Sequence, residues 1–204
     1  MIDLAMETEE LKLPLDDWLV KTERGTRVNK AMLAEHVASD EGGNLISVCQ
    51  TFWKYSCGVW KREEDAQIKA RIRRKIAIRG EALGCLTSAV VDDVFKQLGM
   101  ILLTPPEFQF NREPMVLNFL NGSLDLNEGS FSGKHRRELF QNIQFPYDFE
   151  RELQCPNWAS FLESLKFDTD TLSRLQEWAG YCLLPMVQGT LQKSLFFIGE
   201  GANG

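Results

Sequence analysis

The chain has 204 residues, a formal net charge of −6, and 44% hydrophobic and 25% charged residues. These values are ordinary for a globular chain that buries a core without disulfides or metals. No run of 18 apolar residues occurs, and Met1-Ile2-Asp3-Leu4 is not a basic segment followed by an apolar one. We therefore expect no membrane span, no secretory signal and a cytoplasmic location. The acidic balance disfavours a protein coated by nucleic acid, but a local basic patch is compatible with it.

The first part of the sequence predicts an α+β unit. Residues 1–28 are polar and mixed, and we expect an N-terminal extension with a short helix near residues 15–20. Asn29 can cap a helix that runs to about Ala38. Residues 45–61 are rich in β-branched and aromatic side chains, which is typical of short strands.

Two helices are expected after these strands. Ile68, Ile72 and Ile76 recur every four residues, so residues 63–78 predict one helix, and Gly80 can end it. A second helix is expected over about residues 82–98, and its apolar stripe is formed by Leu86, Val90, Val94 and Leu98. Short strands beside a helix pair favour a small α+β or winged-helix-like unit.

The middle of the chain predicts a linker and a β-rich connector. Residues 99–115 contain Thr104-Pro105-Pro106 and read as the linker. The strands expected next cover residues 116–119, 123–126 and 141–145. Turns are predicted at Ser56-Cys57-Gly58 in the first unit and at Asn121-Gly122 here, where Asn-Gly between apolar runs is a strong hairpin signal.

The last part of the chain is helical and then glycine-rich. One helix is expected around Trp158–Leu165 and another around Leu172–Cys182, which Asp170 can cap. An apolar strand, residues 194–198, runs directly into Gly199. The resulting domain organisation is an extension at 1–28, a helical or winged-helix-like region at 29–110, a β-rich connector at 111–150 and a helical segment at 151–204.

Cysteine and histidine patterns give little support for metal or nucleophilic chemistry. No two of the five cysteines have the two-residue spacing of a zinc ribbon or a redox dithiol, and only His36 and His135 could add nitrogen ligands. We expect free thiols in a reducing compartment. A complete small enzyme using Cys182 or His36 is the weakest of the functional hypotheses. Asp168 and Asp170 have a spacing that metal-binding carboxylates can use, but capping is their ordinary role before a helix.

The glycines at the end of the chain have the spacing of a phosphate-binding loop. Gly199 and Gly204 match the first and last glycines of G-x-x-x-x-G-K-[ST], and a buried-strand pattern precedes them, as that motif requires. Glycine lets the backbone turn its N–H groups toward phosphates. The lysine and the Ser/Thr of the motif are not in the sequence. We therefore expect no ATP hydrolysis and no bound cofactor for this chain alone.

An ordered set of stretches makes the sequence similar to a known family. The sequence resembles the phage and plasmid primase–helicase group of helicase superfamily 3, in the region that precedes the ATPase core of the poxvirus-type replicative helicase. The matching stretches are Phe52-Trp53-Lys54-Tyr55 with Gly58-Val59-Trp60, the residues 117–126, Phe145-Pro146-Tyr147-Asp148, Cys155-Pro156-Asn157-Trp158, the residues 175–185 and the residues 192–204.

The resemblance implies a function for the whole protein. It implies an ATP-driven DNA helicase that works as a ring, requires ATP and Mg²⁺, and acts in the replication of a phage, prophage or plasmid with other replication proteins. Residues 155–190 would lead into an AAA+-type ATPase domain, and residues 194–198 would be its first strand. The phosphate-contacting residues would be Gly199, Gly201, Asn203 and Gly204.

A basic helix is the candidate DNA-binding element. Residues 61–80 contain eight basic and three acidic residues in an acidic chain, and cations of this kind bind phosphates without reading sequence. The candidate residues are Lys69, Arg71, Arg73, Arg74, Lys75 and Arg79. Nearby Trp53, Tyr55 and Trp60 could stack bases, or they could be core residues beside a solvated helix face. Arg136 and Arg137 form a second, weaker candidate patch.

Two functional hypotheses therefore stand beside each other. In the first, the chain is an accessory and connector segment of a replicative helicase and helps to bind DNA or partners. In the second, it is an autonomous interaction module or inhibitor from a decayed mobile element, which docks on helicase subunits. Salt-sensitive DNA binding would favour the first, and tight binding to an intact helicase without DNA would favour the second.

Overall fold

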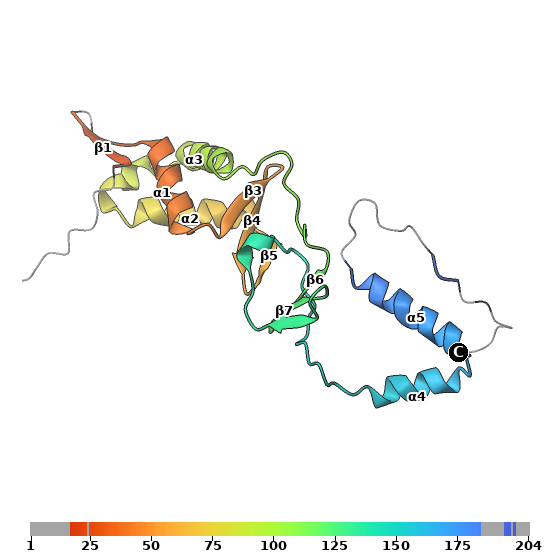
Figure 1. Cartoon of the computed structure of the whole chain (residues 1–204). Coiled ribbons are helices and arrows are strands. Elements are labelled where there is room, and N and C mark those ends of the chain that lie inside the picture. Colours follow the sequence, from red (N-terminus) through yellow and green to blue (C-terminus); the bar gives the residue numbers. More distant parts are fainter. Residues whose placement is uncertain (1–16, 24, 185–193, 197, 199–204) are drawn as a thin grey trace, which may run out of the picture. The chain divides into compact units, whose positions relative to one another are not determined.

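The computed structural model of the chain describes residues 17–23, 25–184, 194–196 and 198. The chain forms two compact units. Unit 1 contains the described residues up to Lys54 and Arg62–Pro106, and unit 2 contains Tyr55–Lys61 and the described residues from Glu107 onward. The described residues are mixed α/β, with five α-helices and three small antiparallel sheets (Figure 1). No helix among them is long and apolar enough to cross a membrane.

Unit 1 is built from helices and two small sheets. Its elements are β1 (Leu19–Thr22), β2 (Gly25–Val28), α1 (Lys30–Asp40), β3 (Leu45–Val48), β4 (Thr51–Ser56), β5 (Val59–Arg62), α2 (Asp65–Ala77), the 3₁₀ helix η1 (Gly80–Cys85) and α3 (Ser88–Ile101). β1 pairs with β2, and β3, β4 and β5 form a second sheet in that order. Residues 55–61 belong to unit 2, and they include the end of β4 and all of β5 except Arg62.

The core of unit 1 lies where the three helices and β1–β4 meet. Ile68, Ile72 and Ile76 of α2 are fully buried, which confirms the four-residue periodicity as the inner face of a helix. They share one cluster with Trp18, at the start of β1, and with buried residues of α1 and α3. Asn29 caps α1 as predicted, because its side chain accepts a hydrogen bond from the Met32 N–H at 3.3 Å.

Two expectations for unit 1 were wrong. The short helix expected near residues 15–20 is not formed in the described part of that range, where Leu19 begins a strand. The second helix of the unit does not begin at Ala82, since that residue lies in η1 and α3 starts only at Ser88. The Thr87 hydroxyl accepts from the Val90 N–H at 3.3 Å and so fixes that start.

Unit 2 contains the third sheet and two C-terminal helices. Its elements are β6 (Val116–Phe119), β7 (Gly122–Asp125), β8 (Ser130–Ser132), the 3₁₀ helix η2 (Arg137–Leu139), α4 (Pro156–Ser164) and α5 (Thr169–Cys182). The predicted β6–β7 hairpin is present, but Phe119 pairs with Gly122, so its turn residues are Leu120 and Asn121, one position earlier than expected. A cluster of aromatic rings covers β6, since Phe119 lies 5.0 Å from Phe145 and 5.3 Å from Phe149, measured between ring centroids.

The strand predicted over residues 141–145 is not formed. This segment is extended but makes isolated bonds instead of a ladder: Trp60 N–H donates to the Gln141 carbonyl at 2.9 Å, and Phe145 N–H donates to the Asn118 carbonyl at 2.8 Å. The Gln141 side chain also donates to the Val116 carbonyl at 2.6 Å. Isolated backbone bonds together with a side-chain amide bond therefore take the place of strand pairing along this segment.

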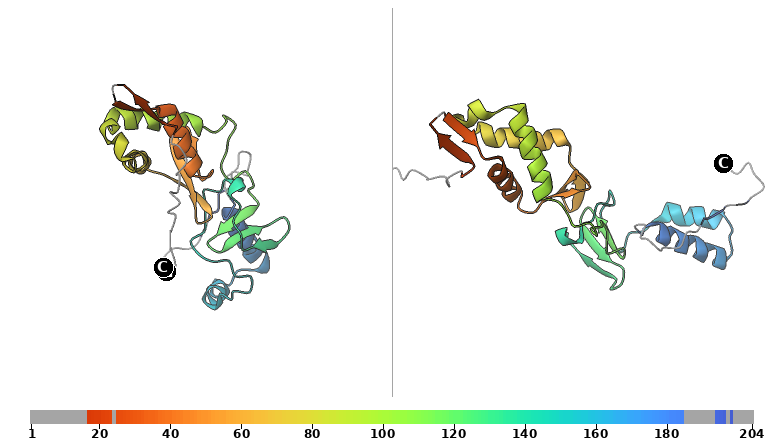
Figure 2. Two further views of the ribbon diagram at one scale, coloured as in Figure 1. Left: turned by 90° about the vertical axis from the view of Figure 1, so that its left-hand side faces the viewer. Right: turned by 90° about the horizontal axis from the view of Figure 1, so that it is seen from above.

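The two C-terminal helices are present as predicted, but neither has a buried residue (Figure 2). Asp168, and not Asp170, caps α5, and it accepts from the Thr171 N–H at 2.8 Å. These hydrogen bonds from Thr171 hold the pKa of Asp168 below its ordinary value. The apolar side of α4 stays partly open to solvent, with Trp158 and Phe161 about half exposed. The predicted strand over residues 194–198 was wrong for its described residues, 194–196 and 198, which form no regular secondary structure.

Candidate functional site

The basic helix predicted from the sequence is α2. Its apolar edge faces the core of unit 1, so its cations are distributed between the two flanks of that edge and the outer face. The flanks lie against neighbouring elements, whereas the outer face lies in solvent. The side chains on the two kinds of position have different partners, and this difference decides which cations are available to a ligand.

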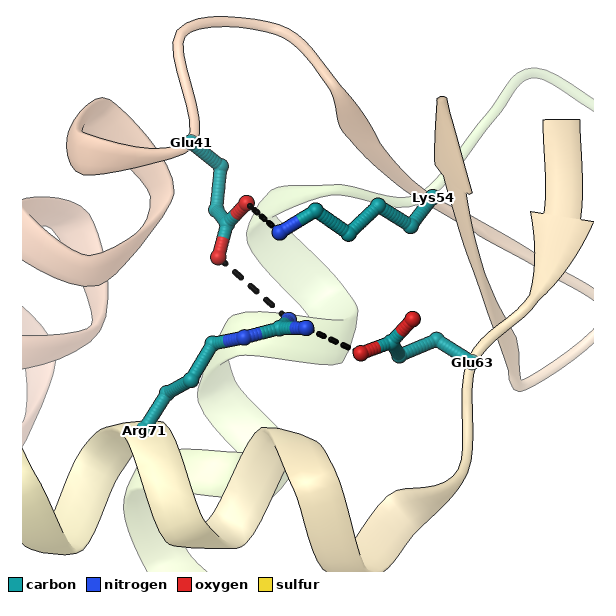
Figure 3. A network of polar contacts seen from close by, with 4 residues as sticks. All are labelled: Glu41, Lys54, Glu63 and Arg71. Carbon is teal, nitrogen blue, oxygen red and sulfur yellow. Dashed lines mark hydrogen bonds and ion pairs between the residues drawn. The ribbon is translucent and has the colours of Figure 1, made fainter. Parts of the chain in front are cut away.

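Arg71 lies on a flank and belongs to an ion-pair network (Figure 3). Its guanidinium is paired with the carboxylate of Glu63 and lies 3.3 Å from that of Glu41. Glu41 also pairs with Lys54 at 3.0 Å. The Glu41 and Glu63 side chains are only 11% and 12% exposed. The network therefore joins the end of α1, β4, the residue after β5 and α2, and its role is to hold unit 1 together.

Lys69 and Lys75 are also paired within unit 1. Lys69 Nζ lies 2.7 Å from Asp92 of α3 and 5.0 Å from the centroid of the Phe95 ring. Lys75 Nζ donates to Asp40, at the end of α1, at 2.6 Å. Arg79, which follows α2, also interacts with neighbouring groups. Lys69 and Lys75 are thus partly neutralised by carboxylates from other helices.

Arg73 and Arg74 differ from the other candidates. Both side chains are exposed, and neither has an ion pair with any described residue. The other exposed positions of α2 are the acidic Asp65 in its first turn and the uncharged Ala66, Gln67 and Ala77. The structure therefore separates the six predicted residues into structural cations and an exposed arginine pair, and only the pair has its full charge directed to solvent.

Two of the three aromatic residues proposed to stack bases, Tyr55 and Trp60, belong to unit 2, whereas α2 belongs to unit 1. Trp60 is 1% exposed and belongs to unit 2, where its ring lies 5.5 Å from Phe140 and 5.4 Å from Tyr55. Its Nε1–H donates to the Arg137 carbonyl at 3.1 Å. For Trp60 the core alternative is correct. Burial, and secondarily the Glu138 carboxylate, raises the pKa of Tyr55.

The second basic patch is partly structural. Arg137 interacts with neighbouring groups, whereas Arg136 is exposed. His135, which precedes the two arginines, contacts β6 and the residue after it. Its Nδ1 lies 3.0 Å from the Asn118 side-chain oxygen, and its Nε2 lies 3.2 Å from the Leu120 carbonyl. Asn118 itself donates to the Gly58 carbonyl at 3.0 Å. His135 therefore packs the β4–β5 turn against β6 within unit 2.

Unit 1 also contains an apolar groove of about 720 Å³. The groove is lined by Phe52, Phe95, Met100 and Leu103, with Asp65 and Lys96 as its charged residues. One acid and one base give it no net positive charge, so we exclude it from the phosphate-binding surface. Among the described residues, no three histidine, cysteine, aspartate or glutamate side chains lie where they could hold a metal ion.

A comparison with models of protein families matches residues 29–166 to the family described as D5 N terminal like. The chain belongs to the D5 N terminal like family. The match covers both units of the structure from α1 to just beyond α4. It identifies the chain as the N-terminal region of a primase–helicase-like replication protein. No curated protein matches the chain in a sequence search.

The family match ends before the predicted nucleotide-binding residues. Gly199, Gly201, Asn203 and Gly204 follow residue 166 and lie outside the described residues. The basic helix α2 lies within the matched range. The sequence could not reveal which of its cations are paired, because their partners Asp40, Glu41 and Asp92 are distant along the chain.

The contrast between Arg71 and Arg73 is testable by stability. Arg71→Ala leaves Glu63 without its cation and should lower the free energy of unfolding by about 2 kcal/mol. Arg73→Ala removes an exposed side chain from the same helix and should change it by less than about 0.5 kcal/mol. Urea denaturation, followed by the Trp18 indole resonance, measures both changes. Equal losses would mean that the Arg71 network contributes nothing to stability.

Proposed function

We propose that this chain is the N-terminal part of an ATP-dependent replicative DNA helicase and that unit 1 contributes phosphate contacts through Arg73 and Arg74. The single observation that supports this function best is the family match over residues 29–166. The exposed arginine pair supports the choice of surface, because nonspecific binding needs cations that are not already neutralised.

The number of available cations predicts weak binding by a single chain. A protein that neutralises several phosphates gains affinity from each released counterion, and here the surface supplies two arginines from one helix. We propose that the parent protein forms a ring, so that several copies contact one DNA molecule and their weak contacts combine. Partners in replication and a requirement for ATP and Mg²⁺ belong to the same proposal.

The helical segment and the glycine-rich end complete the proposed assignment. In this proposal α4 and α5 lead into the ATPase domain. Both helices are amphipathic and bury none of their described residues, as expected for helices whose apolar faces pack against a further domain. Residues 199–204 would hold nucleotide phosphates through backbone N–H groups. The family match supports the replication context but does not extend to these residues.

The DNA-binding part of the proposal is tested with the double variant Arg73→Gln/Arg74→Gln. Each lost phosphate contact should reduce the slope of log K against log salt by about 0.7 for single strands and about 0.9 for duplex DNA. We expect a loss of affinity of at least about tenfold near 0.1 M salt. Fluorescence anisotropy with a labelled 30-nucleotide strand and with its duplex, at several salt concentrations, measures both quantities.

A matched control removes the same charge elsewhere. Arg27 on β2 and Lys134 are exposed and have no ion pair with a described residue, so Arg27→Gln/Lys134→Gln should leave the salt slope almost unchanged. If both double variants lose affinity equally, only the net charge matters and α2 is not the interface. If the wild-type chain binds no DNA but binds an intact helicase, the alternative function as an interaction module is favoured.

A further inference from the structure

We propose that the acidic segment formed by residues 1–16 docks on the exposed face of α2, at Arg73 and Arg74, and there competes with nucleic acid. The docking is an interaction within unit 1 that can be measured without DNA. Its regulatory consequence rests on the proposed function, because the same two arginines are the proposed phosphate contacts.

The charge of the segment is the first argument. Residues 1–16 contain a single lysine, Lys12, and five carboxylates: Asp3, Glu7, Glu9, Glu10 and Asp16. Three of the carboxylates fall within residues 7–10. Clustered carboxylates and clustered guanidinium groups form charge-assisted hydrogen bonds that are stronger than those of neutral groups. The segment therefore has the chemistry of a phosphate mimic.

The state of the cations on α2 is the second argument. Lys69 pairs with Asp92 and Lys75 with Asp40, and Arg71 pairs with two glutamates. Within α2, Arg73 and Arg74 are the cations for which the described residues supply no carboxylate. An acidic segment that approaches this helix consequently meets two guanidinium groups for which no described carboxylate competes.

The position at which the segment joins unit 1 is the third argument. Trp18 is fully buried in the same core cluster as Ile72 and Ile76 of α2. The C-terminal end of α2, which follows Arg73 and Arg74, leads into η1, and η1 contacts β2, the partner of β1. The Cys85 thiol at the end of η1 donates to the Thr26 carbonyl at 3.0 Å. Residue 17, the first described residue, therefore precedes the β1–β2 hairpin, which η1 connects to the C-terminal end of α2.

A buried donor at this place lacks an acceptor among the described residues. The Nε1–H of Trp18 is buried, and no described residue accepts a hydrogen bond from it. A buried N–H without an acceptor is unfavourable, and such groups are usually satisfied by protein or water. A carbonyl or carboxylate oxygen of the preceding segment, lying over this edge of the unit, would satisfy it. The same placement would keep the segment close to α2.

The length of the segment is sufficient for this contact. Sixteen residues can span up to about 50 Å when extended, whereas the thirteen residues of α2 are about 20 Å long. A tethered ligand with this reach has an effective concentration on the order of millimolar. Weak exposed ion pairs therefore suffice to occupy the arginines for a large part of the time.

Docking is tested directly on the full chain, without DNA. We compare the wild type with Glu7→Gln/Glu9→Gln/Glu10→Gln and record the side-chain Nε–Hε resonances of Arg73 and Arg74, assigned with Arg73→Lys and Arg74→Lys. The matched control neutralises three exposed carboxylates of unit 2, Glu150→Gln/Glu152→Gln/Glu163→Gln. We expect both resonances to shift in the segment variant and to stay unchanged in the control. No shift, the same shift in the control, or a shift at Arg27 alone would overturn the proposal.

The competition is tested by DNA affinity at low salt. The segment variant should bind a labelled single strand about threefold to tenfold more tightly than the matched control, as expected for the release of two or three exposed ion pairs. Shifted resonances with equal DNA affinities would overturn the competition. Shifted resonances without DNA binding by any variant would support the docking and overturn the proposed function instead.

Discussion

Replacing Gly122 with alanine should destabilise unit 2 by about 4 kcal/mol. Gly122 begins β7 with a φ angle of +150°, a conformation that residues with a side chain rarely adopt. A Cβ atom at this position would overlap the Ser132 carbonyl oxygen and lie 2.9 Å from the Gly133 Cα atom. Both neighbours are backbone atoms of the adjoining strand and the residue after it, so they cannot move aside without opening the β7–β8 pairing.

Gly129 supplies the control for this prediction. It also has a positive φ angle, +62°, but an added Cβ atom would meet nothing within 4 Å. Gly129→Ala should therefore lower the free energy of unfolding by only about 1 kcal/mol. Urea denaturation, followed by the indole resonance of the buried Trp60, reports on unit 2 in both variants. A Gly122→Ala variant as stable as Gly129→Ala would mean that the β7–β8 pairing does not constrain this turn.

Gly58→Ala should lower the stability of unit 2 by about 3 kcal/mol. Gly58 has a φ angle of +84° in the β4–β5 turn, and an added Cβ atom would overlap the imidazole ring of His135. This ring cannot easily turn away, because its two nitrogens lie 3.0 Å from the Asn118 side-chain oxygen and 3.2 Å from the Leu120 carbonyl. The substitution should separate the turn from β6.

A double-mutant cycle distinguishes the two parts of this effect. In a His135→Ala background the ring is absent, so Gly58→Ala should cost only the backbone strain, about 1 kcal/mol. The difference between the two backgrounds measures the contact between turn and ring. Additive effects of the two substitutions would show that His135 does not hold the turn, and denaturation followed at Trp60 provides all four values.

Local signals in the sequence predicted most of the elements. The isoleucine repeat of α2, the Asn29 cap and the β6–β7 hairpin depend on neighbouring residues only, and all three are confirmed, the hairpin with its turn one residue earlier than expected. β1 and β2 were missed although Val20, Thr22, Thr26 and Val28 provide a β-branched pattern on both sides of a turn. The strand expected at 141–145 failed because the segment combines isolated backbone hydrogen bonds with side-chain amide bonds such as that of Gln141, which no periodicity reveals.

The candidate interface was predicted only as a helix with many cations. Its division into paired and exposed residues depends on carboxylates that the fold brings from afar, such as Asp40 for Lys75. The charge count of residues 61–80 is the same whether those cations are paired or not. Sequence periodicity did place Ile72 inside the unit, but it could not distinguish Arg71, which faces Glu41, from Arg73, which faces solvent.

The tip of the β4–β5 hairpin belongs to unit 2, although the hairpin begins and ends in unit 1. The chain therefore passes between the units three times: before Tyr55, after Lys61 and after Pro106. A single genetic crossover near residue 106 would join unit 1 to the second unit of another protein. Val59 and Trp60 would then lose the residues of their own unit 2 that bury them. Exchange of either unit requires simultaneous replacement of the hairpin tip. The two units are thus expected to be inherited as one module when genes of this family recombine.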